Sequence, residues 1–91
     1  MSALARAMQG FMRALQRWTD TIKRLAYLDT LTLKLRGHVV HVDATWKDGI
    51  FHKEYTKDMV FSQTGTRYME RKKICRHADE LVAEILRARG I

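Results

Sequence analysis

Three of the four histidines in this chain fall within eighteen residues, in the segment HVVHVDATWKDGIFHKEY from residue 38 to residue 55. Imidazole and carboxylate side chains are common metal ligands and common general acids and bases, so the segment raises the question of a metal or catalytic site. The elements that carry these residues decide the answer, because only side chains on one face can act on the same ligand.

The segment has the pattern of a β-hairpin. Apolar and polar residues alternate over residues 38–46 and again over residues 50–56, with Asp48-Gly49 between them. An Asp-Gly pair between two such runs is typical of a two-residue type I′ turn. With this turn, Asp43 would stand directly opposite Glu54, and a positive group would be expected nearby to offset the two like charges.

The period of two places His41, Asp43, His52 and Glu54 on one face of the hairpin. A metal could use the two carboxylates together with one histidine. In the predicted register, however, the two histidines lie at opposite diagonals, too far apart to share metal–ligand bonds of about 2 Å. We therefore expect a solvated face of histidine–carboxylate contacts, with no bound metal.

The opposite face of the hairpin is apolar and is expected to form the floor of the core. Aromatic and basic residues alternate along it from Phe51 to Lys57, with Lys53 expected to extend its ammonium group toward water. The same alternation is also typical of surfaces that stack single-stranded nucleic acid. The apolar face comprises Val40, Val42, Ala44, Trp46, Phe51 and Tyr55.

Before the hairpin, apolar residues alternate between spacings of four and three, which predicts a long amphipathic helix. We expect this helix to pack on its own sheet and on the last helix. At roughly 40 Å it is longer than a small sheet, so its overhanging part is expected to pair with a second copy or a partner helix. A membrane-surface or targeting role also stays open. The positions expected to associate are Leu4, Met8, Phe11, Leu15, Trp18 and Ile22.

Two further elements complete the predicted fold. Residues 31–36 alternate like a half-buried strand that ends at Gly37, and residues 66–89 carry a wide apolar stripe that predicts a second long helix. A short fourth strand is possible at residues 59–61. The sequence thus predicts one α+β domain over residues 1–91, with a helix, a three-stranded antiparallel sheet and a helix. Cys75 lies on the apolar stripe and is expected in the core.

The start of the last helix is strongly basic, and this is the clearest functional signal in the sequence. The helix dipole disfavours cations at an N-terminus, so their presence there costs stability and suggests an anionic partner. Exposed backbone N–H groups with Lys and Arg side chains form phosphate sites. The residues expected to contact nucleic acid are Arg67, Arg71, Lys72, Lys73 and Arg76.

Composition supports the same class of partner. The chain has 91 residues, 46% hydrophobic and 30% charged, and a net charge of +7 that resides in its two ends, while residues 29–66 are neutral. Such a charge favours nucleic acid or an acidic protein surface. No apolar run is long enough to span a membrane. The single cysteine allows no internal disulfide and leaves the compartment undetermined, with an intracellular location favoured over secretion.

The order of helix, three strands and helix, with KKICR near the start of the last helix, resembles a double-stranded-RNA-binding domain. In that family, lysines at this helix start contact phosphates across a groove of the duplex, and recognition is mainly by shape. The resemblance implies that Lys72, Lys73 and Arg76 take this role. The chain departs from the family in having RGH where the family has a Gly-Pro-x-His turn, and in its longer first helix.

No enzymatic activity and no cofactor are expected. The sequence has no glycine-rich phosphate loop, and the predicted register brings no nucleophile to a histidine. Two classes of function remain. One is a nucleic-acid-binding module that uses the basic start of the last helix and the arginines of the first. The other is a small inhibitor or accessory subunit that docks through the first helix. A contiguous basic face would favour the former.

Overall fold

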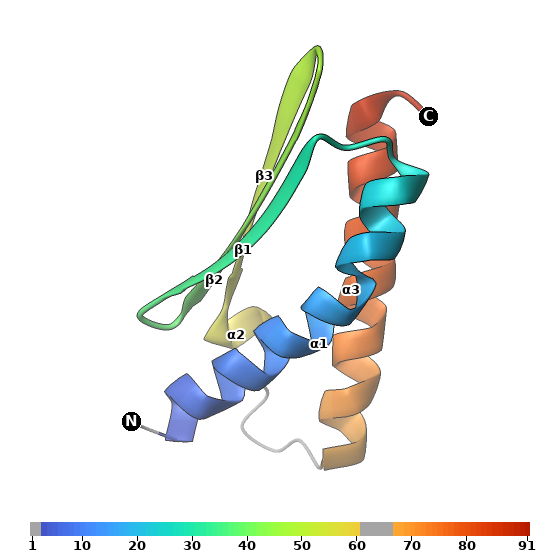
Figure 1. Ribbon diagram of the computed structural model, residues 1–91. Coiled ribbons are helices and arrows are strands. Elements are labelled where there is room, and N and C mark those ends of the chain that lie inside the picture. Colours follow the sequence, from blue (N-terminus) through green and yellow to red (C-terminus); the bar gives the residue numbers. More distant parts are fainter. Residues whose placement is uncertain (1–2, 61–66) are drawn as a thin grey trace.

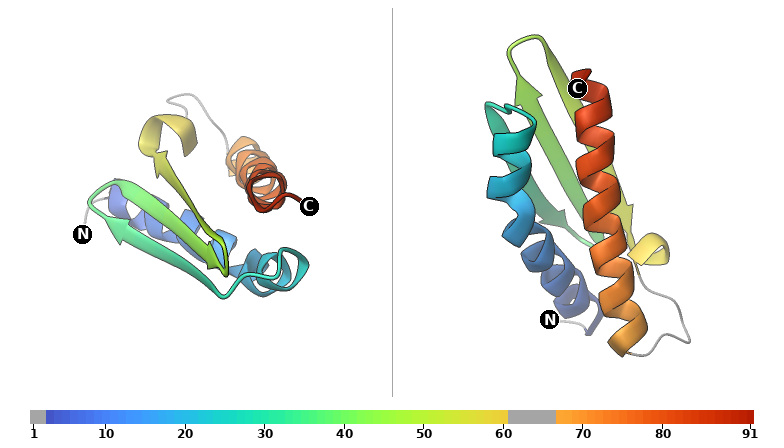
Figure 2. Two further views of the ribbon diagram at one scale, coloured as in Figure 1. Left: turned by 90° about the horizontal axis from the view of Figure 1, so that it is seen from above. Right: turned by 90° about the vertical axis from the view of Figure 1, so that its right-hand side faces the viewer.

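The computed structural model describes residues 3–60 and 67–91, with the side chains of residues 5–60 and 71–91. The three strands form an antiparallel sheet in the order β1-β2-β3, and both long helices cover the same face of it (Figures 1 and 2). The predicted α+β domain is confirmed. The elements are α1 (Ala3–Leu25), β1 (Thr30–Arg36), β2 (Val39–Trp46), β3 (Gly49–Thr56), α2 (Lys57–Val60) and α3 (Arg67–Arg89).

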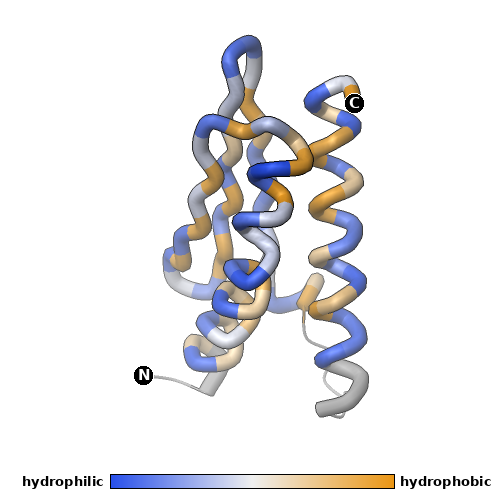
Figure 3. The backbone as a smooth tube through the Cα atoms, turned by 45° about the vertical axis from the view of Figure 1, so that its right-hand side comes forward, coloured by the Kyte–Doolittle hydropathy of each residue, from blue (hydrophilic) through white to orange (hydrophobic). Residues whose placement is uncertain are grey.

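The core lies between the sheet and the two long helices. β2 is the central strand, so its inner side chains Val40, Val42 and Ala44 are fully buried. The alternation of apolar and polar residues along the strands is visible in Figure 3. The helices close the core from the other side with Met8, Phe11, Leu15, Ile22, Ala78, Leu81 and Ile85.

The connection from α1 to β1 is a tight helix C-cap. Tyr27 adopts the left-handed conformation, with φ of 53°, and the N–H of Leu28 donates to the carbonyl of Lys23 at 3.0 Å. This is the Schellman arrangement that ends many helices. The N–H of Asp29 then donates to the carbonyl of Thr45 at 2.8 Å. The cap therefore directs the chain straight from the helix into the sheet.

The turn between β2 and β3 lies one residue earlier than predicted. Trp46 pairs with Gly49, so Lys47 and Asp48 form the two-residue loop. Neither residue is among the described residues with positive φ, which excludes a type I′ turn. A Cβ atom on Gly49 would lie 2.8 Å from atoms of the Trp46 ring. The glycine is thus required by the close approach of the indole. The shift preserves the predicted faces but changes every cross-strand partner.

Replacing Gly49 with alanine is expected to destabilise the domain by about 1–3 kcal/mol, because the indole of Trp46 must move to admit the methyl group. Urea denaturation measures the loss. Gly10→Ala provides the matched control, because nothing lies within 4 Å of the added Cβ and alanine favours the helix by about 1 kcal/mol. A Gly49→Ala variant as stable as the wild type would contradict this account of the turn.

The prediction of a short fourth strand at residues 59–61 is wrong for the two of these residues that the structure describes. Met59 and Val60 belong to the one-turn helix α2 (Lys57–Val60), and Phe61 lies outside the described residues. Val60 is buried in the core, so this turn of helix closes the end of the sheet instead of extending it. None of the described helices has the length and apolar character needed to cross a membrane.

Candidate functional site

A groove of about 940 Å³ runs between α1 and the first half of α3. Arg13 and Arg17 line it from α1, and Arg71 lines it from α3. No acidic residue is among the described residues that line it. The structure therefore brings the basic ends of the sequence together on one surface. The remaining lining residues are Gly10, Ala14, Trp18, Thr21, Ile74 and Cys75.

The three arginines of the groove have no ion-pair partner among the residues that the structure describes. All three side chains are exposed, and none forms an ion pair with another residue that the structure describes. Guanidinium groups stay ionised throughout the physiological range and present donors in a planar fork that matches phosphate oxygens. A groove with three such groups, and no carboxylate among its described lining residues, has a positive potential that favours anions.

The basic surface continues along α1 beyond the groove. Arg6, Arg13, Arg17 and Arg24 are spaced by seven, four and seven residues, and all are exposed. At 3.6 residues per turn, this spacing keeps them within roughly 40° of one line along the helix, over about 27 Å. We call these four residues the arginine row. The spacing of the arginine row can be read from the sequence, but its proximity to Arg71 cannot.

The structure divides the residues predicted to contact nucleic acid. Arg71 lines the groove, whereas Lys72, Lys73 and Arg76 lie roughly 100–200° around α3 from it. Arg76 forms an ion pair with Glu80, with 3.7 Å between Nε and Oε1. Arg67 begins α3, but its side chain is outside the described ones. The residues predicted to contact nucleic acid therefore do not all line one groove.

The residues predicted for self-association are mostly occupied by the core of the domain. Met8, Phe11, Leu15 and Ile22 are buried against the sheet and α3, with at most 2% of each residue exposed, so they are not accessible to a second chain in this fold. Trp18 is 41% exposed and lines the groove. The side chain of Leu4 is outside the described ones. Self-association through α1 stays a prediction, but the four buried residues cannot contribute to it in this fold.

The predicted placement of Cys75 is wrong. Cys75 is exposed and lines the groove, because it lies only about 40° around α3 from Arg71, on the flank that α1 leaves open. The prediction that this face of the hairpin forms the floor of the core is confirmed, since Tyr55 is fully buried and Lys53 is paired with Glu84, and the alternative of a stacking surface is wrong. Cys75 therefore belongs to the candidate site, and the inner face of β3 belongs to the core.

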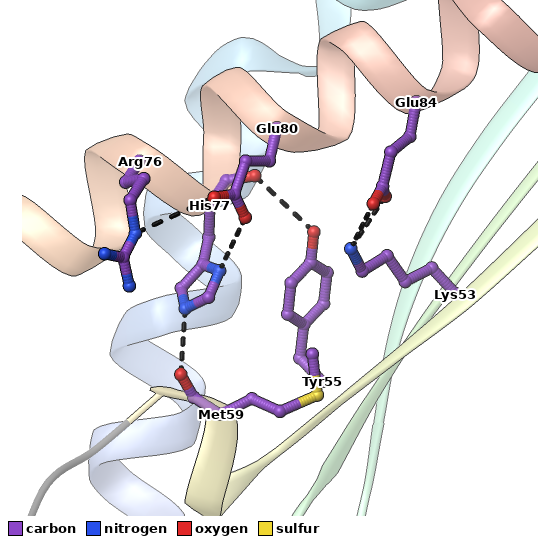
Figure 4. A network of polar contacts seen from close by, with 7 residues as sticks. All are labelled: Lys53, Tyr55, Met59, Arg76, His77, Glu80 and Glu84. Atoms are coloured by element: carbon purple, nitrogen blue, oxygen red, sulfur yellow. Dashed lines mark hydrogen bonds and ion pairs between the residues drawn. The ribbon is translucent and has the colours of Figure 1, made fainter.

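The core face of β3 carries a polar network that the sequence did not reveal (Figure 4). Lys53 Nζ donates to both carboxylate oxygens of Glu84, at 2.7 and 2.8 Å. His77, which is buried, donates from Nε2 to the carbonyl of Met59 at 2.9 Å. Burial, with smaller contributions from Glu84 and Glu80, raises the pKa of Tyr55 well above its usual value. This network joins α2 and α3 to the sheet.

On the outer face of the sheet, the observed register changes the polar pairs. Asp43 pairs with His52, and His41 pairs with Glu54. His41 and His52 are therefore diagonal neighbours, with ring centroids 5.8 Å apart, and the prediction that they lie too far apart to share a ligand is wrong. The hydrogen bond that His52 donates to Asp43, and then the one to Glu54, raise the pKa of His52.

No protein-family model, curated protein or solved structure matches this chain. The similarity to the double-stranded-RNA-binding domain therefore remains one of element order and of a few basic residues. The candidate function has to be argued from the groove itself.

Proposed function

We propose that this protein is a non-enzymatic module that binds the phosphate backbone of nucleic acid in the groove between α1 and α3. The observation that supports this function is the convergence of Arg13, Arg17 and Arg71 on a groove whose described lining residues include no carboxylate. Each guanidinium can donate two parallel hydrogen bonds to one phosphate. The arginine row extends positive charge along α1, with Asp20 as the one acidic residue of that helix beside it, so a strand can follow the helix over several nucleotides.

Trp18 favours a single strand over a duplex. Its indole is 41% exposed at the groove, beside the arginines that would hold the backbone. A base stacked on an aromatic ring contributes about 1–3 kcal/mol irrespective of its identity, but only an unpaired base can reach the ring. We therefore expect single-stranded DNA or RNA to bind more tightly than duplex of the same length, without strong sequence preference.

Replacing Arg13 and Arg17 together with alanine is expected to weaken binding to single strands at least tenfold at low salt. If each arginine neutralises one phosphate, the slope of log K against log salt should become shallower by about 1.4, from roughly 0.7 per phosphate. Fluorescence anisotropy with labelled single-stranded and duplex DNA and RNA, each titrated at several salt concentrations, measures both quantities.

The matched control removes the same charge from the other side of the molecule. Lys34 and Arg36 are exposed on the outer face of β1, away from both helices, so Lys34→Ala with Arg36→Ala should leave most of the affinity and slope unchanged. A second comparison replaces Lys72, Lys73 and Arg76, which lie off the groove. If this triple variant lost more affinity than the variant with Arg13→Ala and Arg17→Ala, the binding site would lie on the solvent side of α3 and not in the groove.

Two results would reject the proposal. Equal losses from the groove pair and the β1 pair would show attraction to the net charge of +7 and no dedicated site. If no nucleic acid binds at low salt, the groove would instead be a site for an acidic protein surface. Binding to a protein partner is the second function that the sequence allows.

A further inference from the structure

The outer face of the sheet carries a compact cluster of potential metal ligands, on the side away from the groove. His41, His52 and Glu54 each offer one ligand atom, and these three atoms lie within 4.8 Å of one another. We propose that this cluster binds a divalent transition metal, with zinc as the ion that it fits best. The site is independent of the proposed nucleic-acid function, because it shares no residue with the groove.

Two distances within the cluster match those between ligands of one metal ion, and the third, between the two histidine nitrogens, is within 4.8 Å. His41 Nδ1 and His52 Nε2 each lie 3.2 Å from the same oxygen, Glu54 Oε1. Neighbouring ligands of a tetrahedral zinc ion, with bonds of about 2.0–2.1 Å, lie roughly 3.3 Å apart. An ion can therefore enter between the three atoms with only small side-chain movements, and its fourth position would face solvent.

Asp43 orients one of the ligands. Its Oδ1 lies 2.6 Å from His52 Nδ1, where it accepts a hydrogen bond from the Nδ1–H. With Nδ1–H held by Asp43, the imidazole can offer only Nε2 to a metal ion, and this is the nitrogen that faces Glu54. A carboxylate behind the ligating histidine is the usual support of zinc-bound imidazole in proteins, since it fixes the tautomer and the ring orientation.

The sheet holds these groups in place. All four come from the adjacent strands β2 and β3, in directly paired positions, and residues on paired strands are positioned more rigidly than residues on loops. Asp43 and Glu54 place two carboxylates at this cluster. Lys34, which pairs with His41 across β1, is the neighbouring cation and is exposed enough to turn toward water. A dication would satisfy both carboxylates at once.

The set of ligands selects the class of metal. Two imidazole nitrogens and one carboxylate oxygen suit zinc and its transition-metal neighbours, whereas calcium and magnesium prefer coordination by oxygen alone. A proton competes for the same position, because histidine must be neutral to bind a metal. Zinc binding is therefore measured at about pH 8.

Isothermal titration of the whole chain with zinc chloride tests the proposal. Because Cys75 is exposed and its thiolate could also bind zinc, the titration uses the Cys75→Ser background. We expect one zinc ion per chain, and no comparable binding of calcium or magnesium. His41→Ala and His52→Ala should each weaken binding at least tenfold, and Asp43→Asn should weaken it by about 10–100-fold as a supporting residue.

His38→Ala is the matched control, because His38 is exposed in the β1–β2 turn and is not part of the cluster. It should bind zinc like the parent. Far-UV circular dichroism confirms that the variants fold, as expected for substitutions on the solvent side of the sheet. Failure to bind zinc, or undiminished binding by the variant that lacks both His41 and His52, would overturn the proposal and leave only hydrogen bonds between these side chains.

Discussion

Phe11→Ala is expected to lower the free energy of unfolding by about 3–5 kcal/mol, as buried aromatic truncations do. Phe11 is 1% exposed and meets Tyr55 edge to face at 5.2 Å between ring centroids, and His77 at 6.0 Å. One side chain of α1 thus contacts both β3 and α3. Since domains of this size are stable by only about 5–15 kcal/mol, the variant should be close to unfolding.

Urea denaturation followed by circular dichroism measures this effect. Ile50→Ala is the control, because Ile50 is 77% exposed and its truncation should change stability by no more than about 0.5 kcal/mol. Phe11→Leu should lose less than Phe11→Ala, since it refills part of the cavity. A loss below about 1 kcal/mol in Phe11→Ala would show that the helices do not close on the sheet through this cluster.

The stability of the domain is expected to fall steeply above about pH 10, the usual pKa of tyrosine. Burial raises the pKa of Tyr55 in the folded protein, so the unfolded chain releases the phenol proton first. Stability from this group is complete below the unfolded pKa and is lost as the pH rises beyond it. The slope is up to about 1.4 kcal/mol per pH unit, until the pH reaches the folded pKa.

Tyr55→Phe isolates this contribution. The phenol makes only a long hydrogen bond of 3.5 Å to the carbonyl of His77, so at neutral pH the variant should lose less than about 1 kcal/mol. Above pH 10 its stability should decline less steeply than that of the wild type. Tyr27→Phe is the control, because Tyr27 is largely exposed and its removal should not alter the slope. Parallel pH profiles for wild type and Tyr55→Phe would contradict the prediction.

The fold was predictable because the sequence patterns that indicate its helices and strands are local and agree with one another. The alternation in β2 and β3 determines which side chains face the core, and that parity survives a shift of the turn by one residue. The register itself was not predictable from Asp48-Gly49, because the indole of Trp46 takes the space over Gly49. Met59 and Val60 form a helix, although their composition also suits a short strand.

The candidate sites depend on contacts between distant residues, and this limits what the sequence reveals about them. The arginine row of α1 follows from spacing alone, but Arg71 joins it only because α1 and α3 pack side by side. The His41–His52 contact likewise exists only in the observed register and vanishes in the predicted one. Cys75 was assigned to the core because periodicity gives the angle of a residue around a helix, but not which flank of that helix its neighbour leaves open.

The placement of the two long helices has a consequence for synthesis on the ribosome. The three strands are consecutive and pair with their neighbours, so the sheet can form from contacts close in sequence. The inner side chains of β2 and β3, however, are covered by helices from opposite ends of the chain. Until residues 67–89 have emerged, the part of the core that Ala78, Leu81 and Ile85 close stays exposed, and transiently exposed apolar surface of this kind is prone to aggregation.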